Sequence, residues 1–217
     1  AVLCEKFAVG NVCYALIGAA IPLMISGGFH VDGYMDTMDA FHSYQSREKK
    51  LEILKDSHIG AFAAIMLALY YMIDIAAISE IHTQKAVSAL AAVFFLARCF
   101  SGIAVMTLQP AKKEGLLYTF ASSAQKVMVK AALYFQTVLC VVLMLLVSGW
   151  YGAAAIGAVL LSFFYFKKKS YKELGGITGD TAGFFVTVCE AAAAAAEMAM
   201  AAYSAAMASI EIGRAHV

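Results

Sequence analysis

Three aspartates with helical spacing are the residues of this chain best suited to chemistry. Asp32, Asp36 and Asp39 lie at i, i+4 and i+7, so on a helix they fall within an arc of about 60°. Such like charges repel one another unless a cation lies among them, and Mg²⁺ favours carboxylate oxygens together with water and substrate phosphates. No Lys or Arg lies at positions 7–46 to pair with them. The stripe therefore predicts Mg²⁺ binding and phosphoryl chemistry, with a solvated helix face as the alternative.

One histidine and three glycines surround this stripe. His30 would lie about 160° from Asp32 on an ideal helix, so it joins the site as a catalytic residue only if the helix begins after it. A lone histidine is more often structural. Gly27, Gly28 and Gly33 would permit a break in the helix and a close approach of ligand to backbone, and the first two are candidates for substrate binding.

Two further segments could contact a substrate. Lys55, Asp56 and Ser57 either contact substrate or form a turn in which Asp56 or Ser57 caps the following helix, and the sequence favours neither. The segment GGITGD, residues 175–180, could hold phosphate oxygens on backbone N–H groups at a helix N-terminus, although it is not a P-loop. Its candidate residues are Gly175, Gly176, Thr178, Gly179 and Asp180.

Four charged residues interrupt apolar runs and need partners there. Asp74, Arg98, Glu190 and Glu197 would each be costly in lipid, so they should face the protein interior. Arg98 is the expected countercharge within the bundle, and Glu190 is a candidate for substrate contact. The lysines at 112–113 could serve a phosphorylated substrate, but membrane orientation explains them better.

The composition is that of a membrane protein. Hydrophobic residues make up 62% and charged residues 14%, and the mean hydropathy is +0.76, whereas soluble domains carry about 25% charged residues. The net charge of +1 gives no indication of nucleic-acid binding. The expected partners are the lipid bilayer and small-molecule substrates. The five cysteines are scattered and form no disulfide or metal-binding pattern.

The apolar runs predict an all-α, polytopic membrane bundle of about six transmembrane helices. The expected spans are 7–29, 60–79, 86–109, two spans within 131–166 separated by a turn at 148–152, and 181–210. Residues 47–56 have an amphipathic pattern suited to an interfacial helix. Residues 1–210 are expected to form a single integral membrane domain, and EIGRAHV at 211–217 is interpreted as a non-native tail.

The distribution of basic residues predicts the orientation. Lys and Arg concentrate in the loops after the first, third and fifth spans, and the positive-inside rule places these loops in the cytoplasm. The aspartate stripe and GGITGD are then expected on the cytoplasmic face. The basic residues concerned are Arg47, Lys49, Lys50, Lys55, Lys112, Lys113, Lys126, Lys130, Lys167, Lys168, Lys169 and Lys172.

Four sequence blocks together resemble those of one enzyme family. GGFHVDGYMDTMDAF, LEILKDSHIGAF, KKEGL and GGITGDTAG occur in this order, and over roughly residues 10–190 the chain resembles cobalamin synthase, adenosylcobinamide-GDP ribazoletransferase. The resemblance implies a multi-pass, Mg²⁺-dependent transferase of substituted phosphate groups in the bacterial cytoplasmic (inner) membrane, acting in the last steps of cobalamin biosynthesis. It would join adenosylcobinamide-GDP to α-ribazole or its 5′-phosphate, giving adenosylcobalamin or its 5′-phosphate and GMP. A homo-oligomer is compatible with this reading.

The resemblance also assigns roles. At the matching positions, Asp32, Asp36 and Asp39, together with Asp180, would hold Mg²⁺ on the pyrophosphate of the substrate. His30 would be the general base, with a metal-held carboxylate as the alternative. His58 stands where the family usually has Arg, and Thr187 where a first Glu of an E-x-x-E pair is common. The family's usual N-terminal portion is absent, which favours a fragment.

Three other classes remain as alternatives. A CDP-alcohol phosphotransferase would show D-G-x-x-A-R followed by G-x-x-x-D-x-x-x-D, and the chain lacks that Arg and the second half. A polyprenyl transferase usually carries two aspartate-rich blocks, whereas GGITGD offers one Asp. An ion-coupled transporter or cation channel would place its acids near mid-span, whereas the densest acids here lie at the end of an apolar run.

Overall fold

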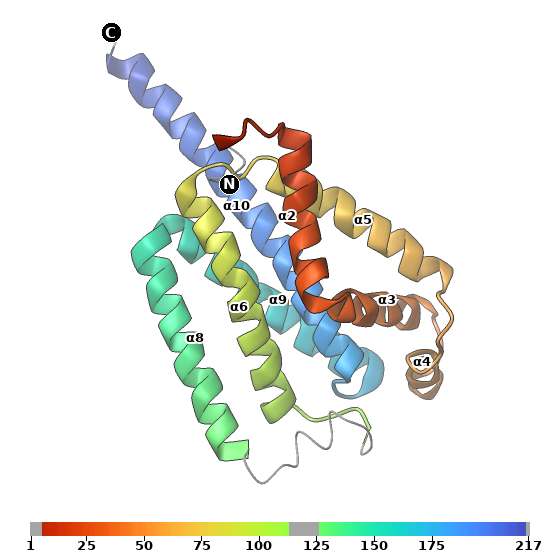
Figure 1. Ribbon diagram of the computed structural model, residues 1–217. Coiled ribbons are helices and arrows are strands. Elements are labelled where there is room, and N and C mark those ends of the chain that lie inside the picture. Colours follow the sequence, from red (N-terminus) through yellow and green to blue (C-terminus); the bar gives the residue numbers. More distant parts are fainter. Residues whose placement is uncertain (1–5, 113–125, 216–217) are drawn as a thin grey trace.

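The computed structural model describes residues 6–112 and 126–215, and helices are the only regular elements in these ranges. The predicted all-α class is confirmed (Figure 1). The helices are α2 (Asn11–Ser26), α3 (Phe29–His42), α4 (Arg47–Ile53), α5 (Ala61–Ile78), α6 (Gln84–Thr107), α8 (Lys126–Ser148), α9 (Trp150–Leu174) and α10 (Gly179–Ala215).

Five helices, α5, α6, α8, α9 and α10, are long and apolar enough to cross a membrane. The pair α2 and α3 together would make a sixth span, but α3 turns away from α2 by 94°. Gly27 and Gly28 form the break, with φ of 61° and 83°, a left-handed conformation that glycine adopts without steric cost. The first predicted span, 7–29, therefore contains a helix of only 16 residues, about 24 Å long.

The other predicted boundaries agree closely with the helices. The expected turn at 148–152 is a break of one residue, Gly149, with φ of 58° between α8 and α9. The amphipathic segment forms α4, and Ser46 caps it by accepting from the Lys49 N–H at 3.4 Å.

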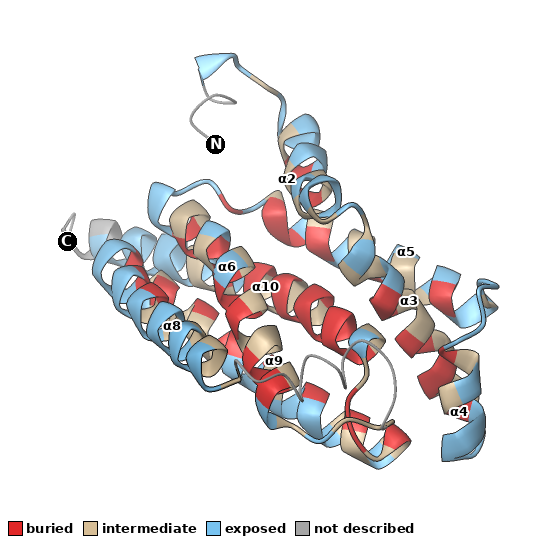
Figure 2. Ribbon diagram, turned by 60° about the horizontal axis from the view of Figure 1, so that its bottom comes forward, coloured by how far each residue is buried: buried red, intermediate tan, exposed pale blue. Residues whose placement is uncertain are grey.

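Helix α10 forms the centre of the bundle. It packs against α3, α5, α6 and α9, and its first half is buried on most sides (Figure 2). Phe184 and Phe185 are fully buried there, and Ala193 and Ala194 permit close packing in the alanine run. Helix α8 is mostly exposed in Figure 2, as expected for a helix whose apolar side chains face lipid.

One end of the bundle gathers the predicted functional segments. Figure 1 shows α3 lying across this end, with α4 beside it and the first residues of α10 close by. The last turns of α6 and α9 reach the same end. A short parallel bridge between Pro110 and Ile177 joins the segment after α6 to the segment before α10. The aspartate stripe and GGITGD therefore lie at the same end.

Candidate active site at one end of the bundle

Two glycines let α3 and α10 cross in backbone contact. A Cβ atom added to Gly33 would lie 2.8 Å from the carbonyl oxygen and 3.0 Å from the Cα of Asp180. A Cβ atom on Gly183 would lie 3.1 Å from the carbonyl oxygen of His30. Only glycine fits at the first of these positions without a shift of backbone. The crossing brings the aspartate stripe of α3 to the N-terminal turn of α10.

Four carboxylates share this crossing. Asp36 interacts electrostatically with Asp32, Asp39 and Asp180, and all three interactions are repulsive. Asp32 is exposed, whereas Asp36, Asp39 and Asp180 are half-buried. Among the described residues, no Lys or Arg forms an ion pair with Asp32, Asp36 or Asp180. The arrangement concentrates negative charge at a partly accessible surface, as a site for a cation or a metal-bound anion does.

The acids do not form a metal cage by themselves. Within residues 6–112 and 126–215, no three His, Cys, Asp or Glu side chains converge closely enough to hold a metal ion. Mg²⁺ commonly uses only one or two carboxylates and completes its shell with waters and substrate phosphates. The donor set at the α3 and α10 crossing fits that open kind of site better than a closed protein cage.

Asp39 has a structural contact that the sequence did not predict. Its Oδ2 accepts from the Gly60 N–H at 2.7 Å, and its Oδ1 accepts from the Ala63 N–H at 2.8 Å. Both N–H groups lie at the start of α5 and have no partner within that helix. The alternative in which Asp56 or Ser57 caps this helix is therefore wrong, because Asp39 supplies the cap from α3.

Asp39 differs from the other acids of the stripe in this respect. Each of its carboxylate oxygens is already engaged by a backbone donor. It links α3 to α5 and holds the stripe in place, and its part in metal binding stays a prediction.

His30 lies inside α3, which begins at Phe29. His30 was expected to join the aspartate stripe only if the helix began after it, and this condition is not met. Its backbone lies against Gly183, and its Nδ1 atom is buried without a hydrogen-bond partner among the described residues. The general-base role stays a prediction that this geometry does not support.

The turn of residues 175–178 connects α9 to α10 with little freedom. Gly175 ends α9 with φ of 80°, and a Cβ on Gly176 would lie 2.5 Å from the Gln109 carbonyl oxygen. Thr178 and Thr181 cap α10 reciprocally: the Thr178 N–H donates to Thr181 Oγ1 at 2.8 Å, and the Thr181 N–H donates to Thr178 Oγ1 at 3.1 Å. Asp180 follows this turn in the first turn of α10, and Gly179 is exposed with open space beside it.

The segment between α4 and α5 is exposed. Lys55, Asp56, Ser57 and His58 all face solvent. His58 donates its backbone N–H to Asp56 Oδ1 at 3.1 Å, and its ring nitrogen lies 2.6 Å from the same oxygen. The hydrogen bond from the ring, with that from the backbone, holds the pKa of the Asp56 carboxyl below its usual value. The predicted substrate contacts of Lys55, Asp56 and Ser57 are compatible with this exposure and stay predictions.

The interior acids have unequal partners. Arg98 Nη1 lies 2.7 Å from Glu190 Oε1, so the predicted countercharge is confirmed. Glu190 is 5% exposed, and its predicted contact with substrate remains untested. Glu197 is fully buried, and neither of its carboxylate oxygens has a hydrogen-bond partner in the described part of the chain. The hydroxyl of Thr187 is likewise buried and unpartnered there.

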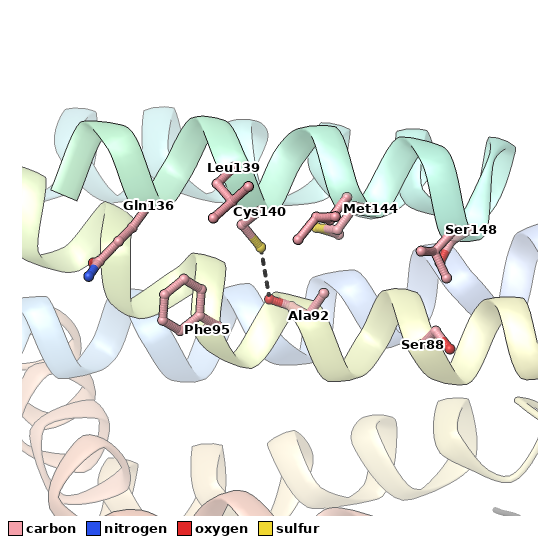
Figure 3. A pocket seen from close by; sticks show the side chains of 10 residues that line it. Ser88, Ala92, Phe95, Gln136, Leu139, Cys140, Met144 and Ser148 are labelled. Atoms are coloured by element: carbon pink, nitrogen blue, oxygen red, sulfur yellow. Dashed lines mark hydrogen bonds between the residues drawn. The ribbon is translucent and has the colours of Figure 1, made fainter. Parts of the chain in front are cut away.

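A separate groove, with no acidic residue in its lining, lies between α6 and α8 (Figure 3). It has a volume of about 310 Å³ and is lined mainly by apolar side chains, among them Phe95, Leu139 and Met144. Cys140 Sγ donates to the Ala92 carbonyl oxygen at 3.7 Å within it. An apolar groove within two membrane-spanning helices does not suit a nucleotide-activated substrate.

Fold and site together define an integral membrane protein of several α-helices, with an acidic site where a bent helix crosses the start of the last one. The chain belongs to the cobalamin-5-phosphate synthase family, whose model matches residues 1–198. The family match agrees with the resemblance predicted from the four sequence blocks.

Named relatives carry one description, adenosylcobinamide-GDP ribazoletransferase. The protein of Lachnoclostridium phytofermentans is 42% identical over 181 residues, which cover 83% of this chain and 69% of that protein. The protein of Clostridium botulinum strain Alaska E43 is 33% identical over 78% of this chain and 68% of its own length. That of Desulforamulus reducens is 31% identical over 80% of this chain and 72% of its own length. No solved structure matches the chain.

Two features near the site were not predicted from the sequence. Arg47 lies over Gly175, and Lys50 of α4 pairs with Glu173 of α9 at 2.5 Å. No local pattern identifies either contact, because each joins residues more than 120 positions apart. The sequence predicted that a ligand could approach the backbone at Gly33. In the structure the backbone of Asp180 occupies that position.

Proposed function

We propose that this protein catalyses the adenosylcobinamide-GDP ribazoletransferase reaction at the α3 and α10 crossing. The observation that carries the proposal is the meeting of Asp32 and Asp36 of α3 with Asp180 of α10 at one end of a membrane bundle. The name of the relatives gives adenosylcobinamide-GDP and a ribazole group as substrates. The resemblance of the four sequence blocks implies α-ribazole or its 5′-phosphate as the acceptor. The products are adenosylcobalamin or its 5′-phosphate and GMP.

The bond changes follow phosphoryl transfer. A hydroxyl oxygen of the ribazole forms a bond to the phosphorus attached to cobinamide, in line with the leaving group. The bond from that phosphorus to the bridging oxygen of the pyrophosphate breaks, and GMP leaves with the electron pair. The hydroxyl proton passes to an aspartate carboxylate of the stripe or to water. Asp36 is our candidate acceptor, because His30 lies inside α3 and its buried Nδ1 atom has no hydrogen-bond partner among the described residues.

Mg²⁺ is the proposed cofactor. Asp32, Asp36 and Asp180 would hold it, because they repel one another and have no ion-pair partner among the described residues. Bound there, it would neutralise charge on the pyrophosphate as GMP departs. Asp39 contributes by holding α3 against α5, and the backbone of residues 175–180 would face the phosphates.

The proposed location is the bacterial cytoplasmic membrane with the site on the cytoplasmic side. The relatives are bacterial proteins, and the basic residues of α4 and of the last turns of α9 lie at the same end of the bundle as the acids (Figure 1). This orientation would give soluble nucleotide-activated substrates access to the site. A membrane-impermeant thiol reagent tests this orientation with a cysteine substituted at position 57, because it reaches the outer face in spheroplasts and the cytoplasmic face in inverted vesicles. Labelling of this position only in inverted vesicles supports the proposal, and labelling in spheroplasts contradicts it.

The function is tested with the full chain in liposomes. Purified protein, adenosylcobinamide-GDP and α-ribazole should release GMP and form adenosylcobalamin in equal amounts, and EDTA should stop both. Ion flux across the same liposomes separates the enzyme from a transporter. Substrate-independent flux without GMP release would contradict the proposed function.

A further inference from the structure

Arg47 is an exposed arginine held against the glycine turn that leads into α10. A Cβ added to Gly175 would lie 2.7 Å from Arg47 Nη1 and 3.0 Å from Cζ, so the guanidinium group rests on the bare Cα of this glycine. Among the residues that the structure describes, no carboxylate lies within ion-pair distance of Arg47. Its positive charge is therefore available to an anion that reaches the turn.

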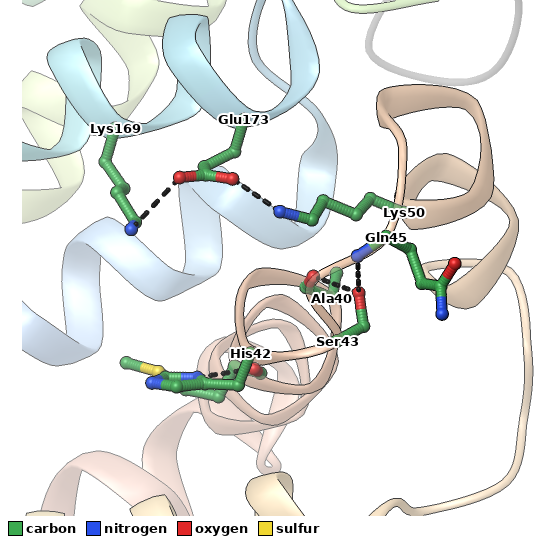
Figure 4. Close-up of polar contacts among 8 residues, drawn as sticks. Ala40, His42, Ser43, Gln45, Lys50, Lys169 and Glu173 are labelled. Atoms are coloured by element: carbon green, nitrogen blue, oxygen red, sulfur yellow. Dashed lines mark hydrogen bonds and ion pairs between the residues drawn. The ribbon is translucent and has the colours of Figure 1, made fainter.

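The short helix that carries Arg47 is firmly anchored. Lys50 Nζ lies 2.5 Å from Glu173 Oε2, and Lys169 Nζ lies 3.1 Å from Glu173 Oε1 (Figure 4). Lys169 also lies over the ring of Phe41, 5.4 Å from its centroid. The Lys50 and Glu173 side chains are 8% and 14% exposed, so solvent screens their attraction little.

The main effect of the buried Lys50 and Glu173 pair is to fix the position of α4 on α9. Burying two charges costs desolvation energy that their attraction offsets only in good geometry, so we attribute to this pair the placement of α4 and no large gain in stability. A second tie comes from Lys112, whose Nζ donates to the carbonyl oxygen of Leu51 at 2.7 Å. Helix α4, although it has only seven residues, is thereby fixed beside the last turn of α9.

The turn then has charges of opposite sign at its two ends. Arg47 lies at Gly175, and Asp180 lies five residues further on, which is no more than about 18 Å along the chain. Between them, Gly176 is packed against backbone and Gly179 is open to solvent. A substrate with a pyrophosphate on a bound metal at the acidic end can place another phosphate oxygen toward the guanidinium group. Arginine suits this contact because its planar fork binds phosphate through two hydrogen bonds.

We propose that Arg47 binds a phosphate of the nucleotide-activated substrate and is a substrate-binding residue of the site. The ligand class is a nucleoside diphosphate group, and this proposal rests on the proposed function of the same site. Lys50, Glu173 and Lys169 act through Arg47 as positioning residues.

Lys49 provides a matched control on the same helix. It is two residues from Arg47 and is likewise positively charged and exposed, but it pairs with Glu52 at 2.8 Å. The full chain in detergent is compared as wild type, Arg47→Ala, Arg47→Lys and Lys49→Ala, with GDP and Mg²⁺ as the binding probe and GMP release as the activity. Thermal unfolding of each variant shows that it is folded, which the exposure of both side chains favours.

Arg47→Ala should weaken GDP binding and raise KM for adenosylcobinamide-GDP by about tenfold or more, the range for a hydrogen bond to a charged group. Arg47→Lys should lie between this variant and the wild type, and Lys49→Ala should change either quantity by about twofold or less. Arg47→Ala with wild-type GDP binding and KM would overturn the inference while the proposed function stands. If the wild type bound GDP more tightly than Arg47→Ala but released no GMP, the proposed function would be overturned. The assignment of Arg47 as a phosphate-binding residue would stand.

Discussion

The close crossing of α3 and α10 predicts a large effect of one added methyl group at Gly33. In Gly33→Ala the new Cβ would lie 2.8 Å from the Asp180 carbonyl oxygen, against about 3.4 Å for an ordinary contact, so the two backbones must separate by about 0.6 Å. Both nearest atoms belong to the backbone of Asp180, so no side-chain rotation can relieve the contact. This separation would change the distances between the aspartates of α3 and Asp180 of α10.

The expected magnitudes follow from this geometry. Overpacking costs about 1–3 kcal/mol, and replacing glycine by alanine within a helix returns about 1 kcal/mol, so the free energy of unfolding should fall by about 0–2 kcal/mol. Turnover should fall more, by about tenfold to a hundredfold, because sub-ångström displacement of positioned groups weakens catalysis steeply. GMP release and thermal unfolding in detergent measure the two quantities.

Gly157 of α9 is the matched control. A Cβ at this position meets nothing within 4 Å, so Gly157→Ala should keep wild-type turnover and be as stable as the wild type or more so by up to about 1 kcal/mol. If Gly33→Ala released GMP at the wild-type rate, the argument that this crossing sets the spacing of the acids would be refuted.

Three further substitutions test other contacts of the site. Asp39→Ala should lower the free energy of unfolding by about 0.5–2 kcal/mol, because α5 loses its cap, and Asp39→Asn should lose less; unfolding to the same extent in both would contradict the capping role. Glu173→Gln should cost about 3 kcal/mol, because two lysines remain poorly paired, and an unchanged unfolding midpoint would count against the anchor of α4. Gly176→Ala should impair both folding and GMP release, since its Cβ would meet the Gln109 carbonyl oxygen at 2.5 Å, whereas Gly179→Ala, with open space around it, should fold normally; equal behaviour of the two would be the adverse result.

Hydrophobic patterning predicted the transmembrane helices well, because lipid requires long uncharged helices with their backbone groups bonded internally. The Arg98 and Glu190 pair was predictable for the same reason, since few other charges inside the bundle could neutralise either one. The position of the first break was harder. The glycines at 27 and 28 allow α3 to begin either before or after His30. In the structure α3 begins before it, at Phe29, and the backbone of His30 packs against Gly183.

The parts of the site that could not be predicted all depend on tertiary contacts. Asp39 has the spacing of a metal ligand within α3, but the start of α5 uses both of its oxygens. The meeting of Arg47 with Gly175 requires α4 to fold back onto α9, and its cause lies in Lys50 and Glu173. Helical spacing identifies side chains on one face, and it does not show which of them another helix will engage.

Asp36→Asn tests most directly whether the acids of α3 and α10 carry Mg²⁺-dependent transfer with loss of GMP. The substitution keeps the size of the side chain and removes the charge that faces Asp32, Asp39 and Asp180. In the full chain it should reduce GMP release by at least about a hundredfold, because the carboxylate is lost from the site. The unfolding midpoint should not fall, because repulsion among the acids is relieved. Wild-type turnover with wild-type dependence on Mg²⁺ in Asp36→Asn would contradict the account.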